Sequence, residues 1–278
     1  MKFVLQKMSV TLANPIQYRL KDDQNVQLMN DLIGKNISLT FLGKIYCASC
    51  KEPTKKSFGQ GFCYPCFLKS PDNSECIIRP ELCLGHEGKG RDVLWELENH
   101  VQEHIVYLAL TSAVKVGITR KTNLTTRWID QGAWKTIVLA QTPNRYLCGK
   151  IEVALKDFLS DKTNWQKMLK NEKDESIDLL AIKQDMIKLL PSELKVFVSP
   201  SDEVQELIYP VNHYPEKVSS ESFDKTPIVN GKLIGIRGQY LIFDGGKVIN
   251  IRKFTGYEVE LSFDESQNEE SPKQMSLF

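Results

Sequence analysis

Four polar residues in the middle of this chain have side chains suited to cleaving a phosphodiester. They are Tyr107, Arg127, Glu152 and Asn164. Hydrolysis of a phosphodiester needs a base for the nucleophile, a cation beside the phosphate and a ligand for a divalent metal. A tyrosine, an arginine and a carboxylate can fill these three roles if the fold brings them together.

The sequence around these residues predicts a small α/β unit. Two short apolar runs, 104–110 and 114–119, are separated by Thr111-Ser112-Ala113, which indicates a β-hairpin. Asn123 is a good N-cap residue, so we expect a helix that carries Arg127 about one turn from its start. A second helical pattern, 147–159, contains Glu152.

At these positions the chain resembles the GIY-YIG nuclease superfamily. Ile105-Val106-Tyr107 stands where that family has its first triplet, and Lys115-Val116-Gly117 where it has the second. Asn123-Leu124-x-x-Arg127 is similar to the start of its first helix. The resemblance covers about residues 104–166. Within the superfamily, the chain is also similar to a bacterial family that couples such a region to an upstream cysteine cluster.

The resemblance implies that Tyr107 is the general base, that Arg127 binds the scissile phosphate and that Glu152 holds Mg²⁺ or Mn²⁺. Asn164 matches the late asparagine of the family. Lys115 stands in place of the second tyrosine, and Gln131 in place of a His or Tyr one turn after the arginine. Lys115 would stabilise a tyrosinate, because an unperturbed tyrosine titrates near ~10. The same departures also fit a domain that binds DNA without cutting it.

An array of the form C-x2-C-x12-C-x2-C lies upstream of this unit. Its members are Cys47, Cys50, Cys63 and Cys66. Four thiolates in two such pairs close a tetrahedral zinc site with no open position, which predicts structural zinc and no catalysis. Gly59 and Gly61 precede the second pair, where the chain must turn sharply. Two reducible disulfides or free thiols are the alternative.

Further potential ligands follow the array. A second zinc site would use Cys76, Cys83, His86 and one later histidine, either His100 or His104. The spacing is irregular, so an iron–sulfur cluster with another ligand stays open, as do plain buried cysteines and surface histidines. Cys148 lies on an apolar helix face and is expected in the core.

The composition is that of a globular protein, with 41% hydrophobic and 26% charged residues. No apolar run reaches about 18 residues and no signal peptide is evident, so we expect a cytoplasmic protein without a membrane partner. The net charge of +1 conceals a basic region, because residues 101–170 carry 11 Lys/Arg against 5 Asp/Glu. Thr119 and Arg120 would bind phosphates that flank the cleaved one. A solvated helix face is the simpler explanation of this surplus.

We predict an α+β fold in five segments. They are an N-terminal β segment (1–45), a zinc-binding module (46–100), a GIY-YIG-like domain with trailing helices (101–200), a β-meander (201–263) and a disordered tail (264–278). Strand-like alternation at 3–12 and 37–46 flanks a more helical 25–32, and a helical pattern covers 172–190. Asp244-Gly245-Gly246 indicates a hairpin turn. The meander is expected to complete one antiparallel sheet or barrel with the N-terminal strands.

The last five residues, Gln274-Met275-Ser276-Leu277-Phe278, follow an acidic stretch that cannot bury enough apolar surface to fold. They resemble the bacterial sliding-clamp-binding peptide, Gln-Leu-Ser/Asp-Leu-Phe, with Met275 in place of leucine. The resemblance implies polar contacts from Gln274 and apolar pockets for Met275, Leu277 and Phe278. The alternative is that this apolar segment docks onto the protein's own sheet.

These features together predict a metal-dependent DNA endonuclease that acts in replication or repair and is recruited by the sliding clamp. The alternative from another class is a non-catalytic zinc-containing adaptor that holds nucleic acid while the tail binds the clamp. Nothing in the sequence distinguishes ribose from deoxyribose, so an RNA substrate also stays open.

Overall fold

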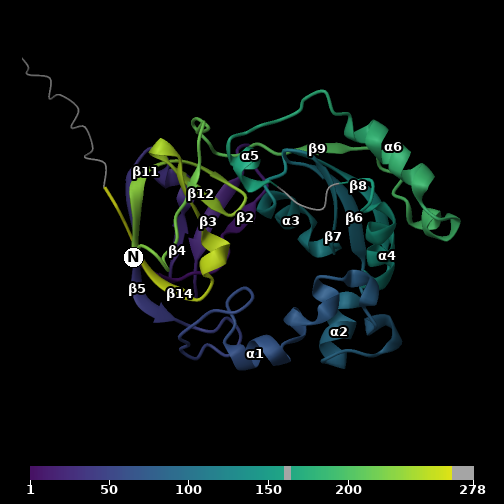
Figure 1. The fold of residues 1–278 in the computed structure, drawn as a ribbon, viewed down its shortest axis with the longest axis horizontal. Helices are drawn as coiled ribbons and strands as arrows, with labels where there is room; N and C mark the ends of the chain where they lie inside the picture. Colours follow the sequence, from purple (N-terminus) through teal and green to yellow (C-terminus); the bar gives the residue numbers. More distant parts are fainter. Residues whose placement is uncertain (160–163, 265–278) are drawn as a thin grey trace, which may run out of the picture.

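The computed structural model describes residues 1–159 and 164–264 of the 278-residue chain. Strands from both ends of this range form one seven-stranded sheet (Figure 1). In order across the sheet they are β1 (Lys2–Val4), β14 (Tyr257–Phe263), β5 (Asn36–Ile45), β11 (Ile228–Arg237), β12 (Tyr240–Phe243), β13 (Lys247–Asn250) and β10 (Ser219–Ser220). The predicted union of N- and C-terminal strands is therefore confirmed. It is an open sheet with β1 and β10 at its edges, and the described residues contain no closed barrel.

The turn between β12 and β13 shows why the sequence folds this way locally. Asp244–Gly246 forms a single 3₁₀ turn, η8, in which Gly245 has φ 73° and Gly246 has φ 80°. L side chains avoid this left-handed region. A Cβ on Gly246 would also lie 2.0 Å from the carbonyl oxygen of Lys217. The hairpin predicted at this turn is present, with Leu241 opposite Ile249.

A three-stranded antiparallel sheet packs near the N-terminal half of the large sheet. It consists of β2 (Ser9–Thr11), β3 (Gln17–Lys21) and β4 (Val26–Leu28). The helical pattern expected at 25–32 is wrong for its first half, because Val26 pairs with Lys21 of β3 as a strand residue. Only the 3₁₀ turn η1 (Met29–Leu32) follows. The interrupted apolar pattern at 3–12 likewise forms two short strands, β1 and β2.

A separate four-stranded antiparallel sheet holds the unit with nuclease-like residues. Its order is β7 (Val114–Arg120), β6 (His104–Leu110), β8 (Lys135–Thr142) and β9 (Val204–Glu206). The helices of this half are α3 (Leu124–Asp130), α4 (Arg145–Leu155), α5 (Trp165–Leu169) and α6 (Leu179–Leu189), with the 3₁₀ turns η6 (Lys121–Asn123) and η7 (Ser192–Phe197). The predicted β6–β7 hairpin is confirmed, since Tyr107 pairs with Gly117 in register.

Both faces of the central strand β6 are covered, so each of its residues is buried. Ile105, Tyr107 and Ala109 belong to a core shared with the large sheet. Val106 and Leu108 pack on the opposite face in a core that includes residues of α4 and α6. The helices begin at side-chain caps: Asn144 accepts from Leu147 N at the start of α4, and Asp178 caps α6.

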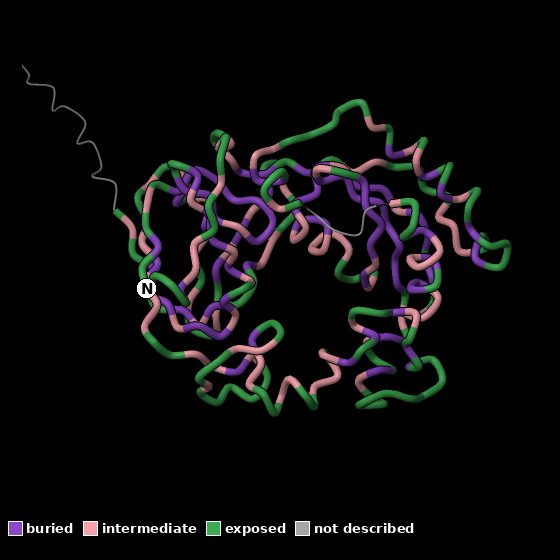
Figure 2. Tube along the Cα trace, viewed as in Figure 1, coloured by how far each residue is buried: buried purple, intermediate pink, exposed green. Residues whose placement is uncertain are grey.

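The segment between the two sheets, residues 46–100, is largely short turns. It contains α1 (Tyr64–Lys69), α2 (Val93–His100) and the 3₁₀ turns η2 (Pro71–Asn73), η3 (Glu75–Ile77), η4 (Pro80–Leu82) and η5 (Gly85–Glu87). Another 3₁₀ turn, η9 (Ile251–Phe254), precedes β14. Figure 2 shows buried chain concentrated in the sheets, while the segment with α1 and α2 is mostly exposed or intermediate. This segment also contains two groups of potential metal ligands.

None of the helices within the described residues has the length and apolar character needed to cross a lipid bilayer.

Candidate functional site: a basic cleft beside a buried tyrosine

Tyr107 and Gly117 lie at the centre of the β6–β7 hairpin. They lie opposite each other on β6 and β7, and a Cβ added to Gly117 would be 2.6 Å from the Tyr107 hydroxyl. Real Cβ atoms do not approach so closely, so glycine is required for the ring to occupy this position. The two triplets seen in the sequence are thus linked by direct packing.

The Tyr107 hydroxyl is inside the protein. The residue is 0% exposed, and its oxygen has no hydrogen-bond partner of good geometry among the described residues. Burial raises the pKa of Tyr107 to about 12, although the neighbouring Arg127 and Gln131 side chains act to lower it. The phenol is therefore protonated at neutral pH. A general base must reach its substrate, and the hydroxyl of Tyr107 is closed off from solvent in this structure.

Glu152 is on the half-buried surface of α4, within electrostatic reach of the tyrosine. Burial raises the pKa of its carboxyl group, and the positive charges of Arg145 and Arg127 oppose that rise. The Glu152 charge in turn raises the pKa of Tyr107. Tyr107, Arg127 and Glu152, from β6, α3 and α4, therefore lie close enough for their charges to act on one another.

Lys115 and Asn164, the other two residues of the predicted catalytic set, lie in different surroundings: Lys115 is buried and Asn164 is exposed. Lys115 is 7% exposed and pairs with Ala109, which places it on the same face of the hairpin as Tyr107. Its charge acts to lower the pKa of Glu152. Asn164 is exposed at the start of α5, where its side chain accepts a hydrogen bond of 3.1 Å from Lys167 N. In this structure Asn164 serves as a helix cap.

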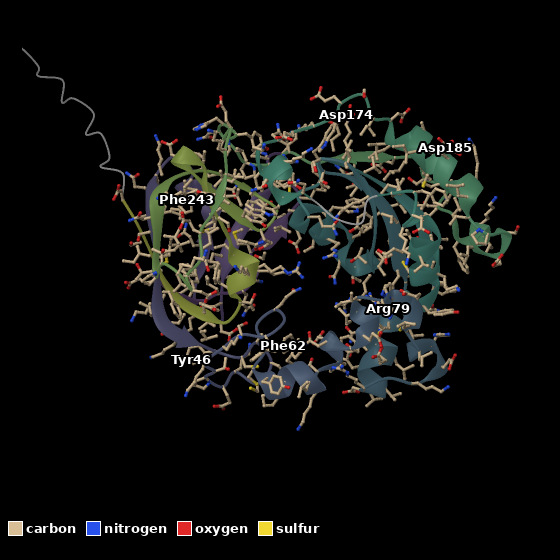
Figure 3. The ribbon with its side chains drawn as sticks, viewed as in Figure 1. Tyr46, Phe62, Arg79, Asp174, Asp185 and Phe243 are labelled. Carbon is tan, nitrogen blue, oxygen red and sulfur yellow. The ribbon has the colours of Figure 1, made fainter. Side chains whose placement is uncertain are left out.

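A cleft of about 580 Å³ opens between the four-stranded sheet, the 46–100 segment and η9 of the large sheet. Four arginines from separate elements line it: Arg120 of β7, Arg127 of α3, Arg145 of α4 and Arg252 of η9. Phe62, labelled in Figure 3, belongs to the part of the wall supplied by the cysteine-rich segment. Thr119, predicted with Arg120 to bind phosphate, also lines the cleft.

None of these four arginines forms an ion pair within the described part of the chain. Arg252 donates to Gln60 Oε1 at 2.8 Å, and Arg120 donates to Asn99 Oδ1. Burial lowers the pKa of Arg252, and the like charge of Arg127 lowers it further. Asp130, which also lines the cleft, opposes this fall. The cations still outnumber the carboxylates of the lining, which favours an anionic ligand.

Sequence reasoning missed Arg145 and Arg252 as members of this wall. Arg145 comes 18 positions after Arg127, and Arg252 comes from the other end of the chain. The basic surplus at 101–170 was the available signal for Arg145. No local pattern around Arg252 could have indicated its position, because only the fold brings η9 to the cleft.

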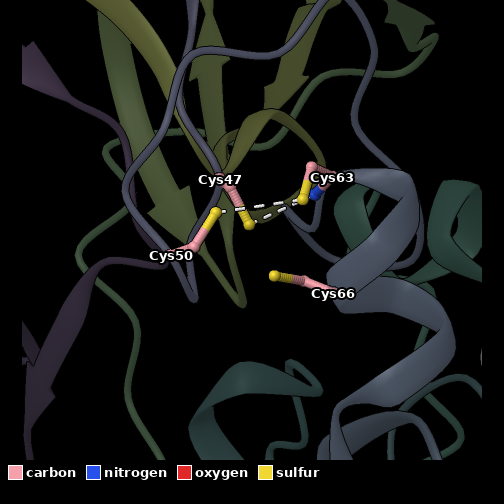
Figure 4. A group of neighbouring side chains, drawn as sticks. All are labelled: Cys47, Cys50, Cys63 and Cys66. Atoms are coloured by element: carbon pink, nitrogen blue, oxygen red, sulfur yellow. Dashed lines mark hydrogen bonds between the residues drawn. The ribbon is translucent and has the colours of Figure 1, made fainter.

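The four cysteines of the C-x2-C array meet at one point (Figure 4). Their sulfur atoms lie within 4.8 Å of one another, and Cys50 Sγ is 3.9 Å from Cys63 Sγ. Ligands at about 2.3 Å from a tetrahedral zinc would be separated by about 3.8 Å. Burial acts to raise the pKa of Cys47, but backbone N–H groups, first that of Cys63, outweigh it and lower the pKa to about 6. The cluster is compatible with structural zinc.

Gly59 and Gly61, which precede the second cysteine pair, have φ values of 55° and 109°. A Cβ on Gly61 would lie 2.7 Å from the Thr255 side chain. The sharp turn expected at these glycines is present, and it brings the cysteine knuckle against the segment that leads into β14.

Three of the four residues expected in a second zinc site are also grouped: Cys76, Cys83 and His100. His86 is not in the group, which corrects the sequence interpretation. Its ring stacks on that of Tyr146 at 4.6 Å between centroids. Glu96 takes the fourth position, because Glu96 and His100 are four residues apart and share one face of α2. The spacing Glu-x3-His was the signal in the sequence. His104 lies nearby but outside the group, with Nδ1 2.8 Å from Gln102 O.

Gln274, Met275, Ser276, Leu277 and Phe278, predicted to bind a sliding clamp, lie outside the described residues.

Neither the curated proteins nor the solved structures contain a match to this chain. The model of the family described as "Protein of unknown function (DUF2797)" matches residues 34–259, a range that begins just before β5 and includes both cysteine groups, the four cleft arginines and the first three residues of β14. The chain belongs to the DUF2797 family.

Proposed function

We propose that this protein binds nucleic acid in the basic cleft and cleaves its backbone at the Tyr107–Arg127–Glu152 site. The observation that carries the proposal is the set of four cleft arginines without carboxylate partners among the described residues. Phosphodiester backbones supply regularly spaced anions, and arginine is the side chain that best matches phosphate geometry.

Arg127 connects binding to chemistry, because it lines the cleft and also neighbours Tyr107. In the proposed site it holds the phosphate and offsets charge that develops in the transition state. Tyr107 is the proposed base. Since its pKa is about 12, it can accept a proton only when cationic groups beside it stabilise the phenolate. Arg127 and Lys115 are the proposed cationic groups.

A divalent metal could bind at Glu152 if the nucleic acid supplies further ligands. Mg²⁺ commonly uses one or two carboxylates and completes its shell with water and substrate phosphate. Glu152 offers a single carboxylate, so we infer that the metal binds together with the nucleic acid. When bound, it would polarise the phosphate as a Lewis acid.

The Cys47–Cys66 cluster is proposed to hold structural zinc that shapes one wall of the cleft, since Gln60 and Phe62 lie within its loop. Residues 274–278 are proposed to bind the bacterial sliding clamp, which would direct the protein to replication or repair sites. That assignment is supported by the sequence resemblance alone.

One observation favours a second candidate function, the non-catalytic adaptor. Tyr107 is 0% exposed and does not line the cleft, so cleavage would require its hydroxyl to become accessible on binding, whereas binding alone would not. An adaptor would use the same arginines for binding, and it would need neither Tyr107 as a base nor metal at Glu152.

The two candidates are separated by one set of measurements on the intact protein. Branched, nicked and flap DNA, and RNA of matched sequence, are incubated with Mg²⁺ or Mn²⁺, and binding and cleavage are recorded separately. We expect Tyr107→Phe and Glu152→Gln to bind like the original protein and to lose at least about 100-fold in cleavage rate. Tyr18→Phe is the matched control, because Tyr18 is also 0% exposed with an unpartnered hydroxyl.

Binding without cleavage by the original protein would favour the adaptor. Cleavage that persists in both site variants would remove this site from the mechanism. Absence of binding to either nucleic acid would contradict both candidates.

A further inference from the structure

A second group of metal-type ligands lies apart from the cysteine array and from the proposed nuclease site. Cys76 is in η3, Cys83 directly follows η4, and Glu96 and His100 are on α2. One donor atom from each of the four lies within 4.8 Å of the donors of the others. Three separate segments of the chain therefore converge on one point.

The distances in this group suit a small tetrahedral ion. His100 Nδ1 is 3.5 Å from Cys83 Sγ and 3.8 Å from Cys76 Sγ. Zinc bonds of about 2.3 Å to sulfur and about 2.0–2.1 Å to nitrogen at tetrahedral angles predict a separation of about 3.6 Å. Glu96 Oε2 contacts the same ring nitrogen directly, more closely than two ligands of one zinc ion lie, so ion binding requires these two side chains to separate slightly.

Burial gives a physical reason for a cation at this centre. Cys76, Cys83, Glu96 and His100 are 8%, 1%, 2% and 3% exposed. A carboxylate and thiolates removed from water are costly unless a positive charge compensates them.

The surrounding packing holds the ligands in place. Arg145 donates to the carbonyl oxygens of Cys76 and Ile77 at 2.9 Å each. Helix α4 approaches the next turn so closely that a Cβ on Gly149 would be 2.4 Å from Glu81 N. The loop that carries both cysteines is thus fixed against the helix that carries Glu152.

We propose that Cys76, Cys83, Glu96 and His100 bind one zinc ion in a closed, four-ligand structural site. Two thiolates, an imidazole and a carboxylate form a donor set that zinc accepts, and full occupation of a tetrahedral shell leaves no position for a substrate. This proposal is independent of the proposed function. The metal would tie α2, the 75–83 loop and, through Arg145, one wall of the basic cleft into a single unit.

The test is the zinc content of the purified full chain, measured by elemental analysis and by native mass spectrometry. We expect two zinc ions per chain in the original protein and one in Cys76→Ser, Cys83→Ser, Glu96→Ala and His100→Ala. Cys148→Ser and His86→Gln are matched controls that should keep both ions. The first changes a buried cysteine outside the groups, and the second changes the histidine that the sequence alone favoured.

A second measurement leaves the four proposed ligands unchanged. The original protein is loaded with Co²⁺, and its thiolate-to-cobalt charge-transfer absorption is compared with that of a chain in which Cys47, Cys50, Cys63 and Cys66 are all serine. We expect the four-serine chain to bind one cobalt and to keep the weaker band of a two-thiolate site. A folded four-serine chain that binds no metal, or a Cys76–Cys83 disulfide detected by the loss of two hydrogens, would overturn the proposal.

Discussion

Tyr107 and Gly117 are paired residues on neighbouring strands, and the glycine leaves the space that the tyrosine hydroxyl occupies. The predicted separation of 2.6 Å between an added Cβ and that hydroxyl allows no side chain at position 117 while the ring stays in place. Because Tyr107 is fully buried in the core beneath α3, it has little freedom to move aside.

Gly117→Ala should therefore lower the free energy of unfolding by about 1–3 kcal/mol, the usual cost of overpacking a core. Urea denaturation measures this change. The same substitution in a Tyr107→Leu background should cost less, since leucine lacks the atoms that clash. If the two substitutions change the free energy of unfolding additively, the backbone moves to relieve the clash and the Tyr107 ring is not its cause.

Cleft arginines should control the salt dependence of nucleic-acid binding. Arg127→Gln and Arg252→Gln are each expected to weaken binding and to reduce the slope of log K against log salt by about 1, because each removes one phosphate contact. Fluorescence anisotropy over a salt series measures both quantities. Arg19→Gln is the control, since Arg19 bonds to Thr11 and Gln17 on the small sheet away from the cleft. Equal slopes in all the proteins would locate binding elsewhere.

His104 should make stability depend on pH. It is 0% exposed, and burial lowers its pKa from 6.5 to about 4. The unfolded chain thus binds a proton at a higher pH than the folded chain does. The contribution of His104 to stability is full above about pH 6.5 and is lost as the pH falls through about 4.

We expect the original protein to lose more stability than His104→Gln when the pH is lowered from about 7.5 to about 5.5. The expected difference between the two losses is about 1–1.5 kcal/mol. Chemical denaturation at the two pH values measures it. Taking the difference between two proteins removes effects of metal release that they share. A difference that does not change with pH would mean that His104 is solvated.

A peptide of residues 264–278 should bind the sliding clamp of a related bacterium. Burial of each large apolar side chain can contribute about 1.5–3 kcal/mol before ordering costs. Replacing both Leu277 and Phe278 by alanine should therefore abolish binding measured by calorimetry. A scrambled peptide of the same composition is the control. Binding by the scrambled peptide, or none by the original, would contradict the assignment.

Some features of this protein follow from local sequence. The β6–β7 hairpin, the turn at Asp244–Gly246 and the helix α4 are encoded by apolar periodicity, glycine conformation and capping residues within a few positions. The meeting of the four cysteines in the C-x2-C array was also predictable, because regular spacing specifies a metal knuckle with little help from distant residues.

Tertiary structure decided what local patterns could not. The exclusion of His86 in favour of Glu96 depends on which face of α2 meets the 75–83 loop. The burial of Tyr107 depends on α3 and the large sheet covering β6 from the same side. Arg252 joins Arg127 only because the last strands pair with the first ones and return η9 to the cleft. Spacing along the chain determines residue chemistry and local conformation, whereas burial, charge neighbours and access to solvent arise from contacts between segments far apart in sequence.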